Sequence, residues 1–215
     1  MRLARLDRWA ERSRLNPYRL LVMPHPAVES AACEALLART PAGAEIAYDL
    51  PLPKWHFLHW AIGQGLLLHG TNMLGLESLT TRAQGDAFGA PTEGLFASDD
   101  AIWPLYFATV RRDALDYGYI NWALHVRGKS RYVFSIGADP RAETSWTTGA
   151  IYLFPGETFV RTGSTRELIS REPPAPRAWL RVEPDDFPFR AQTIEHGAGA
   201  TPMRVVVRHA LRLRR

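Results

Sequence analysis

Two short apolar runs in this chain each stop abruptly at polar residues that could do chemistry. Leu66–Leu68 is followed at once by His69-Gly70-Thr71-Asn72, which is typical of a buried strand that delivers a histidine to a loop. Gly94-Leu95-Phe96-Ala97 is also strand-like, and Ser98-Asp99-Asp100 after it is expected to cap a helix beginning at Ala101. Two strand ends of this kind predict a cleft.

Other candidate groups are weaker signals. His56 and His59 are three residues apart and could share a metal ion, but no further ligands cluster nearby, so packing or surface roles are favoured. Asp99-Asp100 and Asp185-Asp186 are paired acids, for which a helix cap and a solvated turn are favoured over metal binding. Cys33 is the only cysteine, which excludes an internal disulfide, and an ordinary buried thiol is favoured over a nucleophile. No metal site is therefore expected.

Several common cofactor and catalytic motifs are missing from the sequence. It has no GxGxxG after a strand, no GxxxxGK[ST], no HExxH, no CxxC and no GxSxG. Dinucleotide-fold, P-loop and zincin activities therefore lack their residues. A Ser/His/Asp site stays open, because its members come from distant positions.

Composition points to a globular chain with a sizeable core. Its 215 residues are 46% hydrophobic and 11% aromatic, and no apolar run approaches the roughly 20 residues of a membrane helix. The basic N-terminal segment lacks the apolar stretch of a signal peptide, so a cytoplasmic protein without a membrane partner is expected. The net charge is +4. Nearly all of the positive charge comes from arginine, and part of it is concentrated in residues 2–19 and 208–215. Solvated ends are favoured there over nucleic-acid binding.

The order of expected elements predicts the fold class. Helical patterns come first, and strand patterns dominate after the central stretch, which favours α+β with mainly antiparallel sheet over a doubly wound fold. Leu66–Leu68 is expected near the centre of the sheet. The expected helices are 1–24, 27–39 and 55–62, and the later strands are 119–125 and 130–136 as a hairpin, 149–154, 178–182 and 203–207.

The central stretch resembles ADP-ribosyltransferases of the poly(ADP-ribose) polymerase and rifampin-modifying type. Those proteins carry HG[ST] at a strand end and, some tens of residues later, a G-[IV]-[YF]-F-A-[DST] strand followed by a helix. Here the matching elements are His69-Gly70-Thr71 and Gly94-Leu95-Phe96-Ala97-Ser98, with Ala101-Ile102-Trp103 opening the helix. The resemblance implies a bacterial branch of that superfamily, with split antiparallel sheets in residues 63–215 and a helical N-terminal extension, residues 1–62, packed with them as one unit.

The resemblance also implies roles for individual residues. His69 would bind a ribose hydroxyl of NAD, and Gly70 in the same His69-Gly70-Thr71 motif would hydrogen-bond the nicotinamide amide through its backbone. Tyr106 would stack on the nicotinamide ring. Phe96, or Leu95 with a one-residue shift, stands where the family has a strand tyrosine.

Glu172 is the best match to the family's acidic residue. It lies in Ser170-Arg171-Glu172, shortly before the expected strand 178–182, although Pro173-Pro174 directly after it departs from the family pattern. A carboxylate there could stabilise the oxocarbenium-like charge that develops as nicotinamide leaves. His69 and Glu172 are therefore the expected catalytic residues.

Three functions stay open at this point. The first is NAD-dependent ADP-ribosyl transfer to a protein, nucleic acid or small molecule, or NAD hydrolysis, with NAD as the substrate. The second is an inactive module that binds NAD or ADP-ribose, since neither Leu95 nor Phe96 offers a hydroxyl. The third is a nucleic-acid-end-modifying protein whose arginine-rich termini hold phosphates. A purely structural alternative also remains: His69 could bond a neighbouring strand, and Trp103 and Tyr106 could be core residues.

Overall fold

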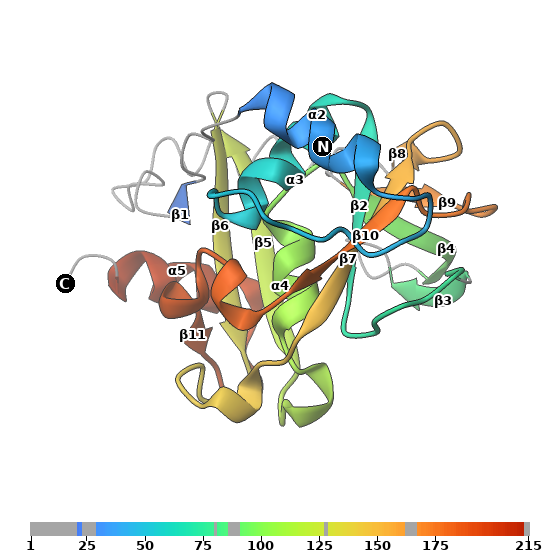
Figure 1. Cartoon of the computed structure of the whole chain (residues 1–215). Coiled ribbons are helices and arrows are strands. Elements are labelled where there is room, and N and C mark those ends of the chain that lie inside the picture. The colour runs from blue at the N-terminus through green and yellow to red at the C-terminus, as the bar shows by residue number, and fades with distance from the viewer. Residues whose placement is uncertain are drawn as a thin grey trace. The chain divides into compact units, whose positions relative to one another are not determined.

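The chain is a mixed α+β structure whose sheets are mainly antiparallel, as the order of its sequence patterns predicts (Figure 1). The computed structural model describes residues 21–22, 29–79, 81–85, 91–126, 129–161 and 167–212. Contacts divide it into two compact units. Unit 1 contains the described residues of 1–25, 111–146 and 188–215, and unit 2 those of 26–110 and 147–187. The boundary expected at residue 62 stays a prediction.

Unit 2 is organised around an antiparallel sheet with Leu66–Thr71 (β2) in its interior. The strand order is β10-β7-β2-β4-β9-β8, and β3 pairs with β4. The run Leu66–Leu68 therefore has the central position expected of it. The remaining strands of this sheet are Arg82–Gly85 (β3), Pro91–Ser98 (β4), Gly149–Pro155 (β7), Val160–Arg161 (β8), Glu167–Ser170 (β9) and Ala178–Val182 (β10).

The two faces of this sheet are covered differently. Successive side chains of a strand point to opposite faces, so Leu67 and His69 share one face while Leu68 and Gly70 share the other. Fully burying a large apolar side chain contributes about 1.5–3 kcal/mol, so the buried side chains of the first face help to stabilise unit 2. Its core consists of Leu67, Leu95, Ala97, Ala150, Tyr152, Phe154, Phe159, Leu168 and Trp179.

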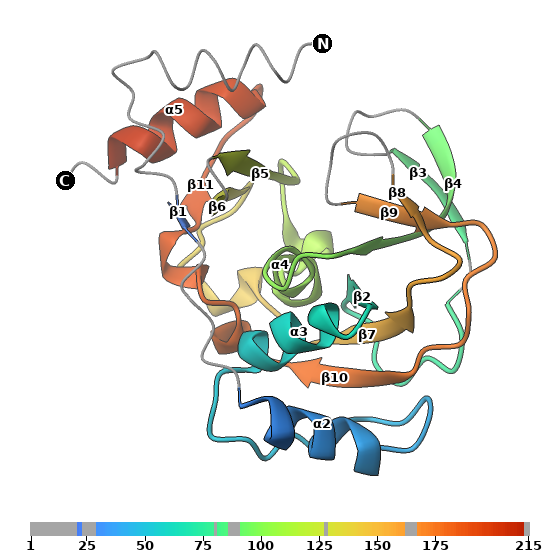
Figure 2. The ribbon, with the colours of Figure 1, turned by 90° about the horizontal axis from the view of Figure 1, so that it is seen from above.

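The helix Trp103–Thr109 (α4) lies on the second face, directly against the strands. A Cβ atom at Gly70 would stand 2.0 Å from the Pro104 carbonyl oxygen, and one at Gly149 would stand 2.0 Å from that of Ala108. The two carbonyls are one helical turn apart. Glycine in β2 and β7 thus lets the α4 backbone rest on the sheet with no side chain between them; Figure 2 looks almost along the axis of α4.

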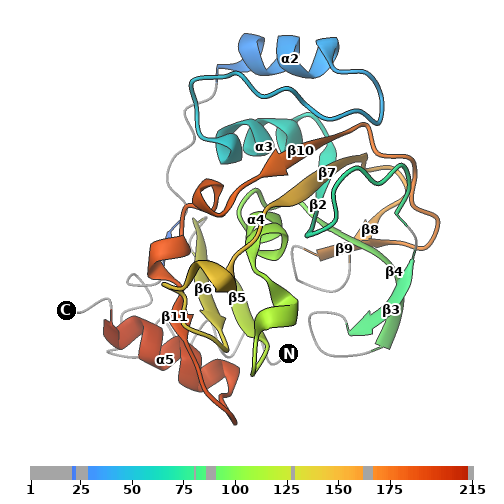
Figure 3. The same cartoon turned by 60° about the horizontal axis from the view of Figure 1, so that its bottom comes forward.

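Two further helices belong to unit 2, and both agree with the sequence patterns. Ser30–Arg39 (α2) buries Cys33 and Leu36. Lys54–Gly63 (α3) is apolar nearly all round, and Phe57, Leu58 and Ala61 are fully buried, as expected for a helix that lies within a core. Figure 3 shows α2 outside α3. A short 3-10 turn, Pro184–Asp186 (η4), follows β10.

Unit 1 is built on two strands expected as a hairpin, Tyr119–Val126 (β5) and Lys129–Ile136 (β6), which pair antiparallel; residues 127–128 are outside the described ranges. The other edge of β6 pairs with Leu21–Val22 (β1, antiparallel) and Ile194–Glu195 (β11, parallel). The helix Pro202–Arg212 (α5, red in Figure 1) packs on β5 and β6. Unit 1 also has the 3-10 turns Arg112–Ala114 (η2), Glu143–Ser145 (η3) and Arg190–Gln192 (η5).

Two secondary-structure predictions are wrong. Residues 203–207 were expected to form a strand because of their three valines, but they lie in α5. There Val205 is buried while Arg204 and Arg208 are exposed, a helical spacing that overrides the strand preference of valine. Leu21–Val22, expected in a helix, is a strand, and residues 1–20 of that expected helix lie outside the described ranges. The helix expected from Ala101 begins two residues later, at Trp103.

Candidate functional site

The end of β2 holds the histidine singled out by the sequence. Nδ1 of His69 lies 2.6 Å from the carbonyl oxygen of Phe96 in β4. A carbonyl can only accept, so Nδ1 carries the proton and donates it. In the neutral ring Nε2 is then the hydrogen-bond acceptor. The side chain is half-buried.

The β2–β4 ladder is short at this point. Among the described residues its only registered pair is Leu68↔Ser98, whereas β2 pairs with β7 along its whole length. Beyond that pair the Phe96 carbonyl is bonded by the His69 imidazole instead of a strand amide. The backbone of Gly70 and Thr71 therefore has β7 on one side and no ladder with β4 on the other.

The residues after His69 are fixed by the surrounding structure. Gly70 is required by the approach of Pro104 described above, which explains this glycine without a ligand. The Oγ1 of Thr71 accepts from the Met73 amide at 3.3 Å. The side-chain amide of Asn72 donates to the carbonyl of Ala108 at 2.7 Å, at the end of α4.

Phe96 and Tyr106 are not placed beside the His69 ring. The pairing Leu68↔Ser98 puts the Phe96 side chain on the α4 face, opposite to His69, so only its carbonyl meets the imidazole. Tyr106 is fully buried in α4, with its ring centroid 5.6 Å from that of Phe187. A ring in this position does not stack on a ligand at His69. Trp103 is half-buried on the same helix.

Glu172 lies in a bend just after β9, next to Arg171, and both are exposed. The last residue of β9, Ser170, is buried, pairs with Leu95 and donates from its hydroxyl to Thr158 Oγ1 at 3.0 Å. Within the described part of the chain, the Glu172 carboxylate forms no hydrogen bond or ion pair. Its convergence with His69 in one site stays a prediction.

Sequence reasoning missed Tyr152, the β7 neighbour of His69. The two are paired in register, and their side chains lie on the same face of the sheet. The Tyr152 hydroxyl accepts from the Leu76 amide at 2.8 Å and donates to the Met73 carbonyl at 3.2 Å, which fastens the segment after β2. Burial raises the pKa of this phenol. A tyrosine inside the apolar run GAIYLF was the available signal, because a buried hydroxyl needs a partner.

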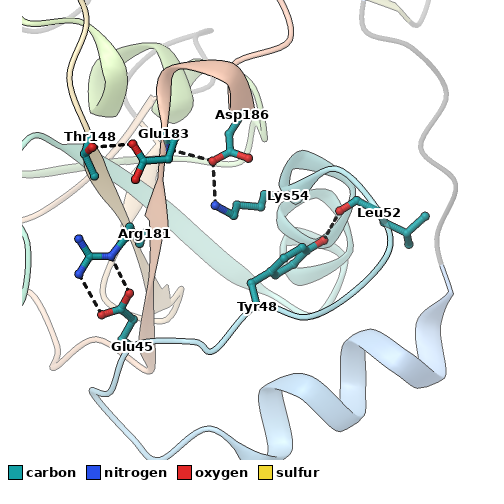
Figure 4. A network of polar contacts seen from close by, with 8 residues as sticks. All are labelled: Glu45, Tyr48, Leu52, Lys54, Thr148, Arg181, Glu183 and Asp186. Atoms are coloured by element: carbon teal, nitrogen blue, oxygen red, sulfur yellow. Dashed lines mark hydrogen bonds and ion pairs between the residues drawn. The ribbon is translucent and has the colours of Figure 1, made fainter.

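A second polar cluster joins α3 to the end of β10 (Figure 4). Lys54 forms an ion pair with Asp186 at 2.8 Å, and Asp186 also accepts from the Glu183 amide at 2.7 Å. Glu183 in turn accepts from the Thr148 hydroxyl at 2.5 Å. The expectation that Asp185-Asp186 is a solvated turn is therefore wrong for Asp186, which is half-buried and completes a capping box.

The same figure shows two contacts on the segment before α3. Arg181 binds Glu45 at 2.9 Å, and the Tyr48 hydroxyl donates to the Leu52 carbonyl at 2.8 Å. Burial, together with the nearby Cys33 and Asp186, raises the pKa of Tyr48. These contacts hold the turn that leads into α3.

The remaining candidates have structural partners. Asp100 is buried and accepts from the Ile102 and Trp103 amides at 2.9 and 3.0 Å, although the N-cap position of α4 is Ile102. Asp99 pairs with Arg161 at 2.6 Å. His56 is buried beside Trp55, with ring centroids 3.7 Å apart. No three or more His, Cys, Asp or Glu side chains of the described residues gather as metal ligands.

Cys33 is a buried thiol, as expected. Burial, and then the nearby Glu29, raises the pKa of this thiol. A raised pKa lowers the thiolate fraction at neutral pH, which argues against nucleophilic reactivity.

Unit 1 contains a serine–histidine pair that sequence reasoning left open. Ser135 Oγ and His196 Nδ1 are 2.7 Å apart, and His196 Nε2 is 3.1 Å from the Tyr117 carbonyl. Ser135 is fully buried and His196 is 4% exposed, so a substrate cannot reach the hydroxyl in this conformation. The pair ties β11 to β6, where Ser135 also contacts the Ile194 carbonyl at 2.8 Å.

Comparison of the chain with family models, with curated proteins and with solved structures finds no match in any of the three. None of the helices in the described ranges has the length and the apolar run that crossing a bilayer requires.

Proposed function

We propose that the end of β2 binds NAD and that the protein transfers ADP-ribose from NAD to an acceptor or to water. The proposal takes its chemistry from the resemblance to ADP-ribosyltransferases. The single observation that supports it best is the short β2–β4 ladder, where His69 bonds the Phe96 carbonyl and Gly70 has no ladder partner in β4.

The protein's part in binding follows from the donor and acceptor atoms at this strand end. Nε2 of His69 accepts a ribose hydroxyl, and the Gly70 backbone amide and carbonyl pair with the nicotinamide amide as a strand partner would. Because Phe96 O fixes the proton on Nδ1, Nε2 is the acceptor atom of His69 without a change of tautomer.

The reaction breaks the bond between C1′ of the ribose and the nicotinamide nitrogen. The bonding electrons leave with nicotinamide, which becomes neutral, and positive charge develops on the ribose. An acceptor lone pair then bonds C1′, and its proton passes to solvent. Glu172 is the carboxylate proposed to stabilise the ribose charge, a contribution typically worth about 10²–10³ in rate.

An inactive NAD- or ADP-ribose-binding module is the second candidate, and one observation favours it. Glu172 lies beyond the end of β9 in an exposed bend, so the described structure gives its carboxylate no fixed orientation. Electrostatic stabilisation of a transition state depends on groups that are held in place before the reaction.

A thermal-shift titration with NAD, ADP-ribose and nicotinamide, followed by an assay of nicotinamide release, tests both candidates. We expect NAD to stabilise the wild type and His69→Ala to lose most of that shift, because its hydrogen bond already exists in the ground state. Glu172→Gln should keep the NAD shift and lose release by about 10²–10³.

Glu157→Gln is the matched control, since Glu157 is also exposed in unit 2 and has no proposed role. Stabilisation by NAD with no release from any variant would favour the binding module. Absence of any shift with NAD or ADP-ribose would refute both candidates.

A further inference from the structure

The exposed side of α5 is a basic surface on unit 1. Arg204 and Arg208 are four residues apart, which puts them on the same face of the helix about 6 Å apart along its axis, and both are exposed. The sequence of α5 contains no aspartate or glutamate, and it continues into Arg214 and Arg215. We define the α5 arginine face as Arg204 and Arg208.

The arginines of this face differ from other arginines in the structure. Arg39, Arg161, Arg181 and Arg190 each form an ion pair with a carboxylate. Within the described ranges, neither Arg204 nor Arg208 does so; Arg208 instead donates to the Glu195 carbonyl at 2.9 Å, which leaves its charge without a neutralising partner there. The α5 arginine face therefore retains its positive charge for a partner.

The packing of the opposite side of α5 distinguishes between two anionic partners, a lipid bilayer and a nucleic acid. A basic amphipathic helix can bind an anionic bilayer only when its apolar face is available to enter the membrane. In the described part of α5 the apolar side chains are packed on unit 1: Val205 is 2% exposed and packs with Val133 and Ile194, and Val206 packs against the same cluster. Among the described side chains of α5, the exposed ones are Pro202, Met203, Arg204 and Arg208. Two guanidinium groups beside one exposed methionine fit a phosphate backbone better than a lipid surface.

We propose that the α5 arginine face binds the phosphodiester backbone of a nucleic acid. Guanidinium groups bind phosphate oxygens in pairs, and two successive turns of α5 offer two such groups in a row. The contact is to the backbone and carries no base readout, so it is independent of sequence. This inference does not depend on NAD binding, because it concerns residues of unit 1 alone.

Salt-dependent binding of a labelled single-stranded oligonucleotide of mixed sequence to the full chain tests the proposal. Each phosphate neutralised contributes about 0.7 to the slope of log K against log salt for a single strand and about 0.9 for a duplex. We expect Arg204→Gln to lower the slope by about that amount and to weaken binding by about two- to fivefold, the range for one exposed charge pair. Glutamine keeps the helix preference of α5.

Arg204→Gln is the cleanest variant, because the Arg204 side chain makes no polar contact among the described residues. Arg204→Gln with Arg208→Gln should lower the slope about twice as much. The charge-matched control is Arg39→Gln with Arg141→Gln, two exposed arginines that are not part of α5. A parallel titration uses phosphatidylserine vesicles, and a duplex of the same sequence distinguishes single-stranded from double-stranded partners.

A reduced slope in both α5 variants, with the control unchanged, supports the proposal for whichever nucleic acid binds. Equal losses in the control and the α5 variants would mean that only net charge matters, and would overturn it. Binding to vesicles but not to oligonucleotides would also overturn it, as would no oligonucleotide binding by the wild type at low salt.

Discussion

His69 at the end of β2 and Glu172 were both expected to be catalytic, but their surroundings differ: Glu172 follows the end of β9. At the end of β2, His69 bonds the neighbouring strand, Gly70 touches a helix backbone and Asn72 bonds the end of α4. After β9, Glu172 is exposed and in contact with none of the described polar groups. The residues at the end of β2 are therefore held by contacts with the rest of unit 2, whereas the Glu172 side chain after β9 is not.

This difference separates two kinds of evidence for function. A histidine and a glycine at β2 are explained by packing and hydrogen bonding, whether or not a ligand binds there. Glu172 has no structural task in the described structure, so any requirement for it must come from chemistry. Variants at β2 should therefore cost stability, and variants at Glu172 should cost only activity.

The largest expected effect is that of Gly70→Ala. A Cβ atom 2.0 Å from the Pro104 carbonyl oxygen forces α4 off the sheet, and a backbone cannot yield as a flexible side chain does. We expect a loss of about 3 kcal/mol in the free energy of unfolding, measured by urea denaturation. Gly63→Ala is the control: its Cβ would meet nothing within 4 Å, so stability should stay the same or rise. Equal effects of the two would show that α4 is not seated on Gly70.

A smaller loss is expected at Asn72. Asn72→Ala removes the donor to the Ala108 carbonyl, which should cost about 1–2 kcal/mol. Asn72→Asp should be worse, because a carboxylate cannot donate and its charge faces the negative end of α4. Thermal unfolding of the wild type, Asn72→Ala and Asn72→Asp ranks their stabilities. If aspartate were tolerated better than alanine, the contact with α4 would not be the reason for Asn72.

Tyr152→Phe tests the segment that follows β2. Phenylalanine keeps the ring, whose centroid lies 6.1 Å from that of Trp179. It loses the hydrogen bonds to Leu76 and Met73, which should lower the free energy of unfolding by about 1 kcal/mol. Hydrogen exchange at the Leu76 amide should accelerate more than at β7 amides. Uniform acceleration of both would mean that the hydroxyl does not fasten this segment.

Tyr152→Phe should also change how the free energy of unfolding depends on pH in the alkaline range. Burial raises the pKa of Tyr152 above its ordinary value of 10.0, so the unfolded chain ionises first. The contribution of Tyr152 to stability is then complete below about pH 10 and is lost as the pH rises through the folded-state pKa. Tyr152→Phe should flatten part of that decline in urea denaturation measured across this range. An unchanged decline would assign it to other groups, among them Tyr48, whose pKa burial also raises.

Local patterns predicted much of this structure because they reflect local physics. The apolar run Leu66–Leu68, the pairing of β5 with β6 and the bonds of Asp100 to the Ile102 and Trp103 amides each depend on a few neighbouring residues. Residues 203–207 show the limit, since three valines prefer strands in general but here follow the helical spacing of the surface on which they pack.

The candidate site could be predicted only in part, because it depends on which face of the sheet each residue occupies. His69 was found from its place at a strand end, but the register Leu68↔Ser98 turns Phe96 away from it, and the position of α4 buries Tyr106. Tyr152 was missed because a cross-strand pair joins residues that are far apart in the sequence. A sequence motif specifies neither the register of a strand pair, nor the position of α4, nor which residues pair across strands.

The smallest effect on stability is expected at Glu172. A variant of this residue tests most directly the difference between the end of β2 and the residues after β9. Glu172→Ala removes an exposed carboxylate without a described partner, so the free energy of unfolding should change by no more than about 0.5 kcal/mol. Urea denaturation with Glu157→Ala in parallel measures this against another exposed glutamate of unit 2. A loss above about 1 kcal/mol would show that Glu172 is held by the fold after all, and its exposure would then not describe the protein in solution. A stable Glu172→Ala protein that has lost nicotinamide release would place the requirement for Glu172 in the chemistry, because nothing else about the protein would have changed.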